Sequence, residues 1–63
     1  KVGVVANATT IKKGGSQCLI KLEDESGVIY GTFQSALRGE VALLGVVAKD
    51  PQGVPYIKIS KAE

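Results

Sequence analysis

The residues of this chain with the most informative chemistry are two tyrosines, Tyr30 and Tyr56, in strand-like segments. Thr32 follows Tyr30 by two positions, and Lys58 follows Tyr56 by two positions. Because side chains alternate along a strand, residues two apart share a face, and Tyr30 and Thr32 point away from the side of Ile29. An exposed aromatic ring stacks a nucleic-acid base with a gain of about 1–3 kcal/mol, and a nearby lysine contacts phosphate. These types and spacings predict a surface for single-stranded nucleic acid. The alternative without a binding function is that the tyrosines are half-buried strand residues and that the lysines only keep the sheet surface solvated.

Catalytic chemistry has little support in the sequence. The chain has no histidine, and its one cysteine, Cys18, alternates with Ile20 on the side of a strand expected to be buried, where a thiol is inert. Residues 23–25 (Glu-Asp-Glu) lie in a turn, where acidic side chains solvate the chain, and we expect Asp24 to accept hydrogen bonds from the backbone there. Residues 14–16 (Gly-Gly-Ser) have no following helix and no P-loop spacing. We therefore expect no enzymatic activity, no metal and no cofactor.

Five strand-like segments position these residues. The segments are 1–11, 17–23, 28–34, 40–49 and 54–60, identified by β-branched residues and by alternation of apolar and polar side chains. The second and third form a hairpin around the acidic turn. Between the others, residues 12–16 are a glycine-rich loop, 50–53 (Asp-Pro-Gln-Gly) fit a type I turn, and 35–39 form a short connection with one helical turn ended by Gly39.

These segments predict an all-β fold, a small five-stranded barrel with little or no helix. Glycines inside three strands (Gly3, Gly31 and Gly45) suit strands that coil tightly. A closed sheet also leaves few bare edges in a chain of 63 residues with no disulfide or metal to staple it. An SH3-like barrel would have a similar composition and is the structural alternative.

Three stretches give the chain a family resemblance. They are residues 2–5 (Val-Gly-Val-Val), 19–29 (Leu-Ile-Lys-Leu-Glu-Asp-Glu-Ser-Gly-Val-Ile) and 39–47 (Gly-Glu-Val-Ala-Leu-Leu-Gly-Val-Val). With them the chain resembles, over essentially its whole length, the OB-fold domains of the tRNA-anticodon-binding and nucleic-acid-helicase type. The resemblance implies strand order 1-2-3-5-4-1. It also implies single-stranded nucleic acid on the outer face of the second and third strands, between loops 12–16 and 49–53.

Three positions depart from the anticodon-binding pattern. Leu19, Glu23 and Tyr30 stand where such domains usually have an aromatic residue, an arginine and a glutamine. With two exposed aromatics and a formal charge of +2, we expect weak binding of single-stranded DNA or RNA with little sequence preference. The implied strand order places the fifth strand beside the third, so Tyr30 and Tyr56 would share a face. The residues expected at this nucleic-acid surface are Lys12, Lys13, Lys21, Tyr30, Thr32, Lys49, Tyr56 and Lys58.

The alternative function is protein docking or oligomerisation without nucleic-acid binding. In segment 40–49 one face carries Val41, Leu43 and Val47, and the other carries Leu44 and Val46. A barrel of this size has one interior, so closure between the first and fourth strands would leave an apolar stripe outside, and such stripes often mark partner surfaces. Isolated surface aliphatic residues are the bland alternative. The expected stripe comprises Val2, Val4, Leu44 and Val46, and it would face the rest of a parent protein or a second copy.

The organisation expected is one OB-fold domain over residues 1–63, excised from a larger protein because the chain begins with Lys1 at a strand-like run. The longest apolar run, residues 41–48, is too short to cross a bilayer. No apolar signal-peptide segment is present, and a single cysteine fits a reducing compartment. We therefore expect a cytoplasmic domain with no membrane partner.

Overall fold

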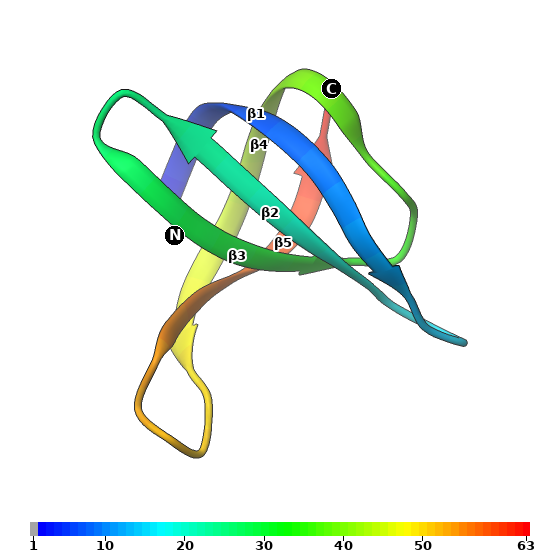
Figure 1. Ribbon diagram of the computed structural model, residues 1–63, viewed down its shortest axis with the longest axis vertical. Helices are drawn as coiled ribbons and strands as arrows, with labels where there is room; N and C mark the ends of the chain where they lie inside the picture. Colours follow the sequence, from blue (N-terminus) through cyan, green and yellow to red (C-terminus); the bar gives the residue numbers. More distant parts are fainter. Residues whose placement is uncertain (1) are drawn as a thin grey trace.

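Alternating side chains build five strands in this chain. The computed structural model describes residues 2–63, and Lys1, expected to open the first strand, lies outside the described residues. The strands are β1 (Val2–Lys13), β2 (Cys18–Asp24), β3 (Gly27–Phe33), β4 (Arg38–Lys49) and β5 (Pro55–Ala62), as shown in Figure 1. No helix in residues 2–63 has the length and apolar character needed to cross a membrane.

The strands close into a single barrel in the order β1-β2-β3-β5-β4. Every neighbouring pair is antiparallel except β3 and β5, which run parallel. Strand β1 is long enough to pair with β4 through its first part (Val2–Thr9) and with β2 through its second part (Asn7–Lys13), and this double pairing closes the barrel. The predicted all-β, five-stranded OB-like barrel and its strand order are confirmed.

The interior of the barrel is filled by alternate residues of the strands. Ile20 and Leu22 of β2 are the largest fully buried side chains. Ile29 and Phe33 of β3 are partly buried and pack against the core from the same face. The inward orientation predicted for Cys18 is also confirmed, because its side chain is buried. The buried apolar residues are Ala6, Ala8, Cys18, Ile20, Leu22, Val41, Leu43, Ile57 and Ile59.

Two of the three strand glycines allow a close approach in this small interior. A Cβ built on Gly45 would lie 2.5 Å from the carbonyl oxygen of Lys58 and 2.7 Å from Cγ2 of Ile57. A Cβ on Gly31 would lie 2.9 Å from Cδ1 of Ile59. Both glycines therefore remove side-chain volume where the wall coils inward against β5. Gly3 is different, since its Cβ would make an ordinary 3.4 Å contact with Leu44.

A bulge near the end of β1 extends that strand further than the sequence predicted. The register against β2 shifts between Thr10 and Lys12, so that Ile11 is an extra residue. Lys12 and Lys13, expected in the loop, pair with Leu19 and Cys18 of β2. The loop is correspondingly short and runs from residue 14 to 17. A bulge adds one residue to one strand, so it also reverses which face the following side chains occupy.

The connection between β3 and β4 contains no helical turn, and the expectation of one was wrong. Arg38 and Gly39 already belong to β4. The connection is held instead by a side chain: Thr10 Oγ1 donates to the carbonyl oxygen of Leu37 (2.8 Å) and accepts from its backbone N–H (2.9 Å). With both backbone groups of Leu37 satisfied by β1, four residues are enough to link the strands, and a helical turn has no room to form.

Both predicted turns are confirmed. The N–H of Gly53 donates to the carbonyl oxygen of Asp50 (2.9 Å), and the carboxylate of Asp50 accepts from the N–H groups of Gln52 and Val54. At the other turn Asp24 Oδ1 accepts from the N–H (2.8 Å) and the hydroxyl (2.6 Å) of Ser26. These bonds favour the ionised carboxylate and hold the pKa of Asp24 below its ordinary value.

Candidate nucleic-acid interface

The parallel pairing of β3 with β5 places the two tyrosines side by side. Tyr30 is the register partner of Tyr56, and on its other side Tyr30 is the partner of Lys21 on β2. The three side chains therefore form one row across the outer wall of the barrel. Tyr30 has an exposed fraction of 41%, which leaves ring surface free to stack on a ligand.

A second row lies parallel to the first, two residues along the strands. Here Leu19 pairs with Thr32, and Thr32 pairs with Lys58. Lys12 completes the row as the partner of Leu19 on β1. Strict alternation from the buried Ala6 and Ala8 would point Lys12 into the core, and the bulge at Ile11 reverses that. The second row thus has Leu19 and Thr32 at its centre and a lysine at each side.

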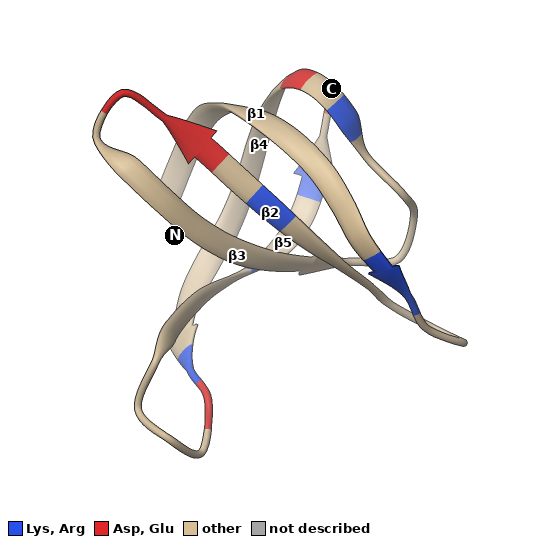
Figure 2. Cartoon of the chain, viewed as in Figure 1, with Lys and Arg blue, Asp and Glu red and all other residues tan. Residues whose placement is uncertain are grey.

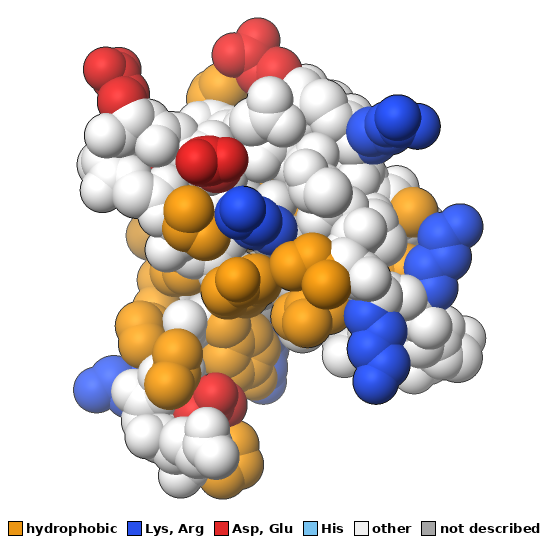
Figure 3. Space-filling view, in the orientation of Figure 1, with side chains coloured by type: hydrophobic (Ala, Val, Ile, Leu, Met, Phe, Trp, Pro, Cys, Tyr) orange, Lys and Arg blue, Asp and Glu red, His pale blue; other side chains and the backbone are white. Residues whose placement is uncertain are grey.

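Five residues of the two rows form the floor of a groove of about 500 Å³ on the barrel surface, namely Leu19, Tyr30, Thr32, Tyr56 and Lys58. We call it the outer groove. Gln17 of the β1–β2 loop contributes to one end, and the β4–β5 turn contributes to the other through Asp50 and Pro51. Figure 3 shows hydrophobic side chains gathered at the centre of this face, with a hollow below them between the two loop regions. The lining residues are Gln17, Leu19, Tyr30, Thr32, Lys49, Asp50, Pro51, Val54, Pro55, Tyr56 and Lys58.

The structure gathers most of the predicted nucleic-acid residues at this groove. Tyr30, Thr32, Lys49, Tyr56 and Lys58 line it. Of the other three, Lys21 stands next to Tyr30, and Lys12 lines an adjacent depression together with Leu19 and Thr32. Lys13 is exposed at the end of β1 and lines neither surface.

The sequence prediction omitted several lining residues. Leu19 was expected to face outward but was not assigned to the site, although alternation on β2 places it beside Thr32. Gln17, Val54 and Pro55 come from loop and strand ends, where local sequence pattern gives no direction. Only the folded turn brings Pro51 and Val54 over the groove.

The charges are arranged so that the groove is flanked by lysines. Figure 2 shows basic residues at the end of β1, within β2 and β5 and at the end of β4, and acidic residues at the β2–β3 turn. The carboxylate of Asp50 faces its own turn and is occupied by two backbone N–H groups. Among residues 2–63 the ion pair present joins Lys61 and Glu63 near the end of β5, so no groove lysine is paired with an acidic side chain there.

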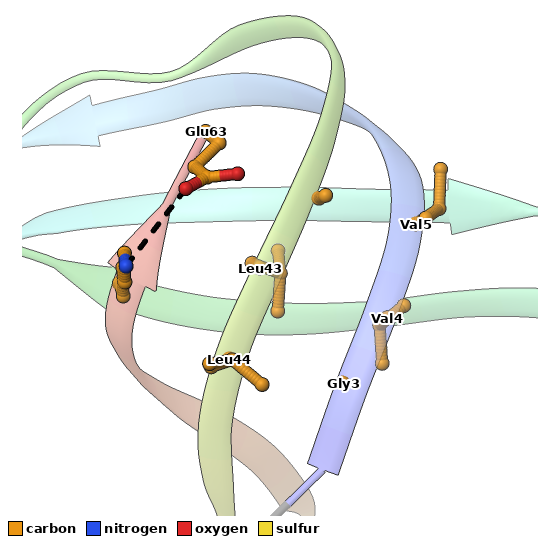
Figure 4. Close-up of a pocket in the computed structure, with 8 residues that line it drawn as sticks. Gly3, Val4, Val5, Leu43, Leu44 and Glu63 are labelled. Carbon is orange, nitrogen blue, oxygen red and sulfur yellow. Dashed lines mark ion pairs between the residues drawn. The ribbon is translucent and has the colours of Figure 1, made fainter.

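The predicted apolar stripe has a different composition from the one expected. Val2 and Val4 are partly buried and pack against the core, since they pair with the inward-facing Gly45 and Leu43 of β4. Their assignment to an outer stripe was wrong. Leu44 and Val46 do lie outside, and the exposed β1 residue near Leu44 is Val5, at 59%, whose register partner is Ala42. Figure 4 shows Val5 and Leu44 on neighbouring strands around a shallow pocket that Gly3 and Glu63 also line.

Comparisons of this chain with models of protein families, with curated proteins and with solved structures found no match. The outer groove therefore has to be interpreted from its own residues and geometry.

Proposed function

We propose that this chain is an OB-fold nucleic-acid-binding module that holds single-stranded DNA or RNA in the outer groove, weakly and with little sequence preference. The observation that carries the proposal is the register pairing of Tyr30 with Tyr56 on the groove floor, with Lys58 and Lys49 lining the same groove. Two adjacent aromatic rings offer a stacking platform for consecutive bases, and each stacked base contributes about 1–3 kcal/mol.

The lysines around the platform supply the second part of the binding energy. Lys58 and Lys12 stand at opposite sides of the second row, and Lys21 stands beside Tyr30. A strand lying across the tyrosines would bring its phosphates within reach of these side chains, and the released counterions make such binding weaken with salt. Among the described residues that line the groove, Gln17, Thr32 and the two tyrosine hydroxyls are the neutral hydrogen-bonding side chains, and so small a set supports low discrimination between bases.

The test is fluorescence anisotropy with labelled oligothymidylate and oligouridylate of about twelve nucleotides, within the ~4–16 that one OB-fold occupies. We expect binding at low salt that falls steadily as salt rises. Tyr30→Ala should weaken binding by about fivefold or more, because it removes one stacking ring. Tyr30→Phe keeps the ring and is the matched control, for which we expect nearly unchanged affinity.

Two results would refute the proposal. One is the absence of oligonucleotide binding at low salt by protein that circular dichroism shows to be folded. The other is binding that is equally strong in Tyr30→Ala and Tyr56→Ala, which would locate the ligand elsewhere on the barrel.

A second candidate function is docking through the outer surface shared by β1 and β4. The favouring observation is the adjacency of two large exposed side chains, Val5 and Leu44 (41% exposed), with the small residues Gly3 and Ala42 between them. A shallow, mostly apolar surface of this kind suits a second copy of the chain. Sedimentation analysis should then show self-association that Leu44→Lys abolishes and that Tyr30→Ala leaves intact; a monomer at all concentrations would exclude the self-association.

A further inference from the structure

One end of the barrel is open and apolar, and the proposed function does not use it. A cavity of about 330 Å³ lies at this end, which we call the mouth. It is lined by residues of all five strands and of the β2–β3 turn, and two of its valines, Val28 (49%) and Val47 (48%), remain half-exposed to solvent. The opposite end of the barrel contrasts with it, because Leu37, fastened to Thr10, packs against the core there.

The walls of the mouth include two strand segments that have a neighbour on one side only. Residues 2–6 of β1 pair with β4, whereas β1 and β2 pair only from Asn7 onward. Gly27, Val28 and Ile29 of β3 pair with β2, whereas β3 and β5 pair only from Tyr30 onward. In residues 2–63 no backbone hydrogen bond outside the strand ladders reaches either segment. An unpaired strand edge is a ready template for another strand.

Among residues 2–63, the charge that lines the mouth has one sign. Asp24 is the charged residue among the described residues that line the cavity, and the exposed Glu23 and Glu25 flank it in sequence. The carboxylate of Asp24 is fixed toward Ser26 by two hydrogen bonds, so it stays in place at the rim. A partner with lysine or arginine side chains complements this rim. A second copy of the chain does not, since a two-fold contact would set one acidic turn against the other.

We propose that the mouth is a docking site for an extended, basic segment of a partner protein that carries an apolar side chain at every second position. The apolar side chains enter the cavity between Val28 and Val47. The backbone of the segment pairs with the free edge of β1 or β3, and its basic side chains meet the acidic turn. Main-chain pairing gives such complexes affinity, and pockets for alternate side chains give them specificity.

The test uses a fluorescent peptide of alternating lysine and valine, about eight residues long and thus longer than a strand of ~5–6 residues. A lysine–serine peptide of equal charge and a glutamate–valine peptide of equal apolarity are the ligand controls. We expect the lysine–valine peptide to bind about tenfold or more tighter than either control. Equal binding of the lysine–serine peptide would overturn the proposal, because charge alone would then explain the interaction.

The protein variants form a matched pair. Val47→Ser removes apolar surface from the mouth and should weaken peptide binding by about tenfold. Val46→Ser changes the next residue, which is equally exposed but faces outward, and should leave binding unchanged. Both should melt near the temperature of the unaltered protein, because neither side chain is buried. Equal affinity of the two variants would overturn the assignment of the site to the mouth.

The backbone part of the proposal is tested separately by amide hydrogen exchange. The peptide should slow exchange at alternate amides of residues 2–6 or 27–29, which face the open edges. Unchanged exchange in both segments with the peptide bound would exclude strand pairing. Oligonucleotide affinity should not respond to Val47→Ser, so this proposal and the one for the outer groove succeed or fail independently.

Discussion

The outer groove and the mouth are built from the same strands but have opposite chemistry. On β3 the neighbouring residues Ile29 and Tyr30 belong to the mouth and to the groove respectively. The groove offers aromatic rings beside lysines, whereas the mouth offers aliphatic side chains beside a fixed carboxylate. Because the side-chain period of a strand is two, the single step from Ile29 to Tyr30 moves the side chain from the face that lines the mouth to the face that lines the groove. The inner and outer faces of a single β-sheet can therefore carry two unrelated sites.

Both sites depend on the same core, so the largest effect that we expect is the loss of both when that core is damaged. Ile20 is fully buried, so Ile20→Ala leaves a cavity and should lower the free energy of unfolding by about 2–5 kcal/mol. A core this small rarely supplies more than ~3–5 kcal/mol. We expect the variant to be largely unfolded and to lose oligonucleotide and peptide binding together. Urea denaturation followed by circular dichroism measures the loss; a change below about 1 kcal/mol would contradict the buried position.

Two glycine-to-alanine variants distinguish a steric clash between neighbouring strands from the addition of a methyl group that makes only an ordinary contact. Gly45→Ala places a methyl group against the carbonyl of Lys58 and should destabilise the barrel by about 1–3 kcal/mol. Gly3→Ala adds the same methyl group where only Leu44 is in ordinary contact, and we expect a change within about 0.5 kcal/mol. Thermal unfolding of both proteins gives the comparison. Similar losses in the two would show that β4 and β5 do not approach as closely as described.

The independence of the groove and the mouth is tested by titrating one variant of each site with both ligands. Tyr30→Ala should weaken oligonucleotide binding by about 1–3 kcal/mol and leave the lysine–valine peptide unaffected. Val47→Ser should do the reverse. Anisotropy titrations of both variants with both ligands measure the four affinities. If each variant weakened both ligands to the same extent, the groove and the mouth would have to be treated as one site.

The smallest expected effect concerns the acidic turn. Hydrogen bonds from Ser26 lower the pKa of Asp24 in the folded state. A lowered pKa means that the turn's contribution to stability is complete above the ordinary carboxyl pKa and is lost as the pH falls through the lowered value. Asp24→Asn and Ser26→Ala should therefore flatten the acid side of a melting-temperature profile slightly, while Glu25→Gln should not. An unchanged profile in both turn variants would show that these bonds do not favour the ionised form.

Much of this fold could be predicted from alternation and turn chemistry. Cys18, Ile20 and Leu22 alternate with Leu19 and Lys21, and this was enough to separate the inner face of β2 from the outer face. Asp50-Pro51-Gln52-Gly53 identified its turn through the fixed φ of proline and the freedom of glycine, which has φ +86° here. Such signals are local, so they can be interpreted correctly without knowing how the rest of the chain folds.

The errors arose where a residue's environment depends on a distant strand. Val2 and Val4 were placed outside because no local signal states which residue of β4 lies opposite them; their partners are Gly45 and Leu43, both inward-facing. The helical turn expected before Gly39 is absent because Thr10, 27 residues earlier than Leu37, satisfies that connection. Neither pairing can be recognised from the residues that are adjacent in the sequence.

By itself the sequence determined the fold class and the outward position of Tyr30, Tyr56 and Lys58. The tertiary structure alone decided the face that Lys12 occupies, because the bulge at Ile11 turns it outward beside Leu19, at the depression next to the groove. It also decided that the mouth stays open, because β1 leaves β2 at Asn7 and β3 meets β5 only at Tyr30. The physical reason is that side-chain direction is a local property of a strand, whereas register and closure are settled only when the strands meet.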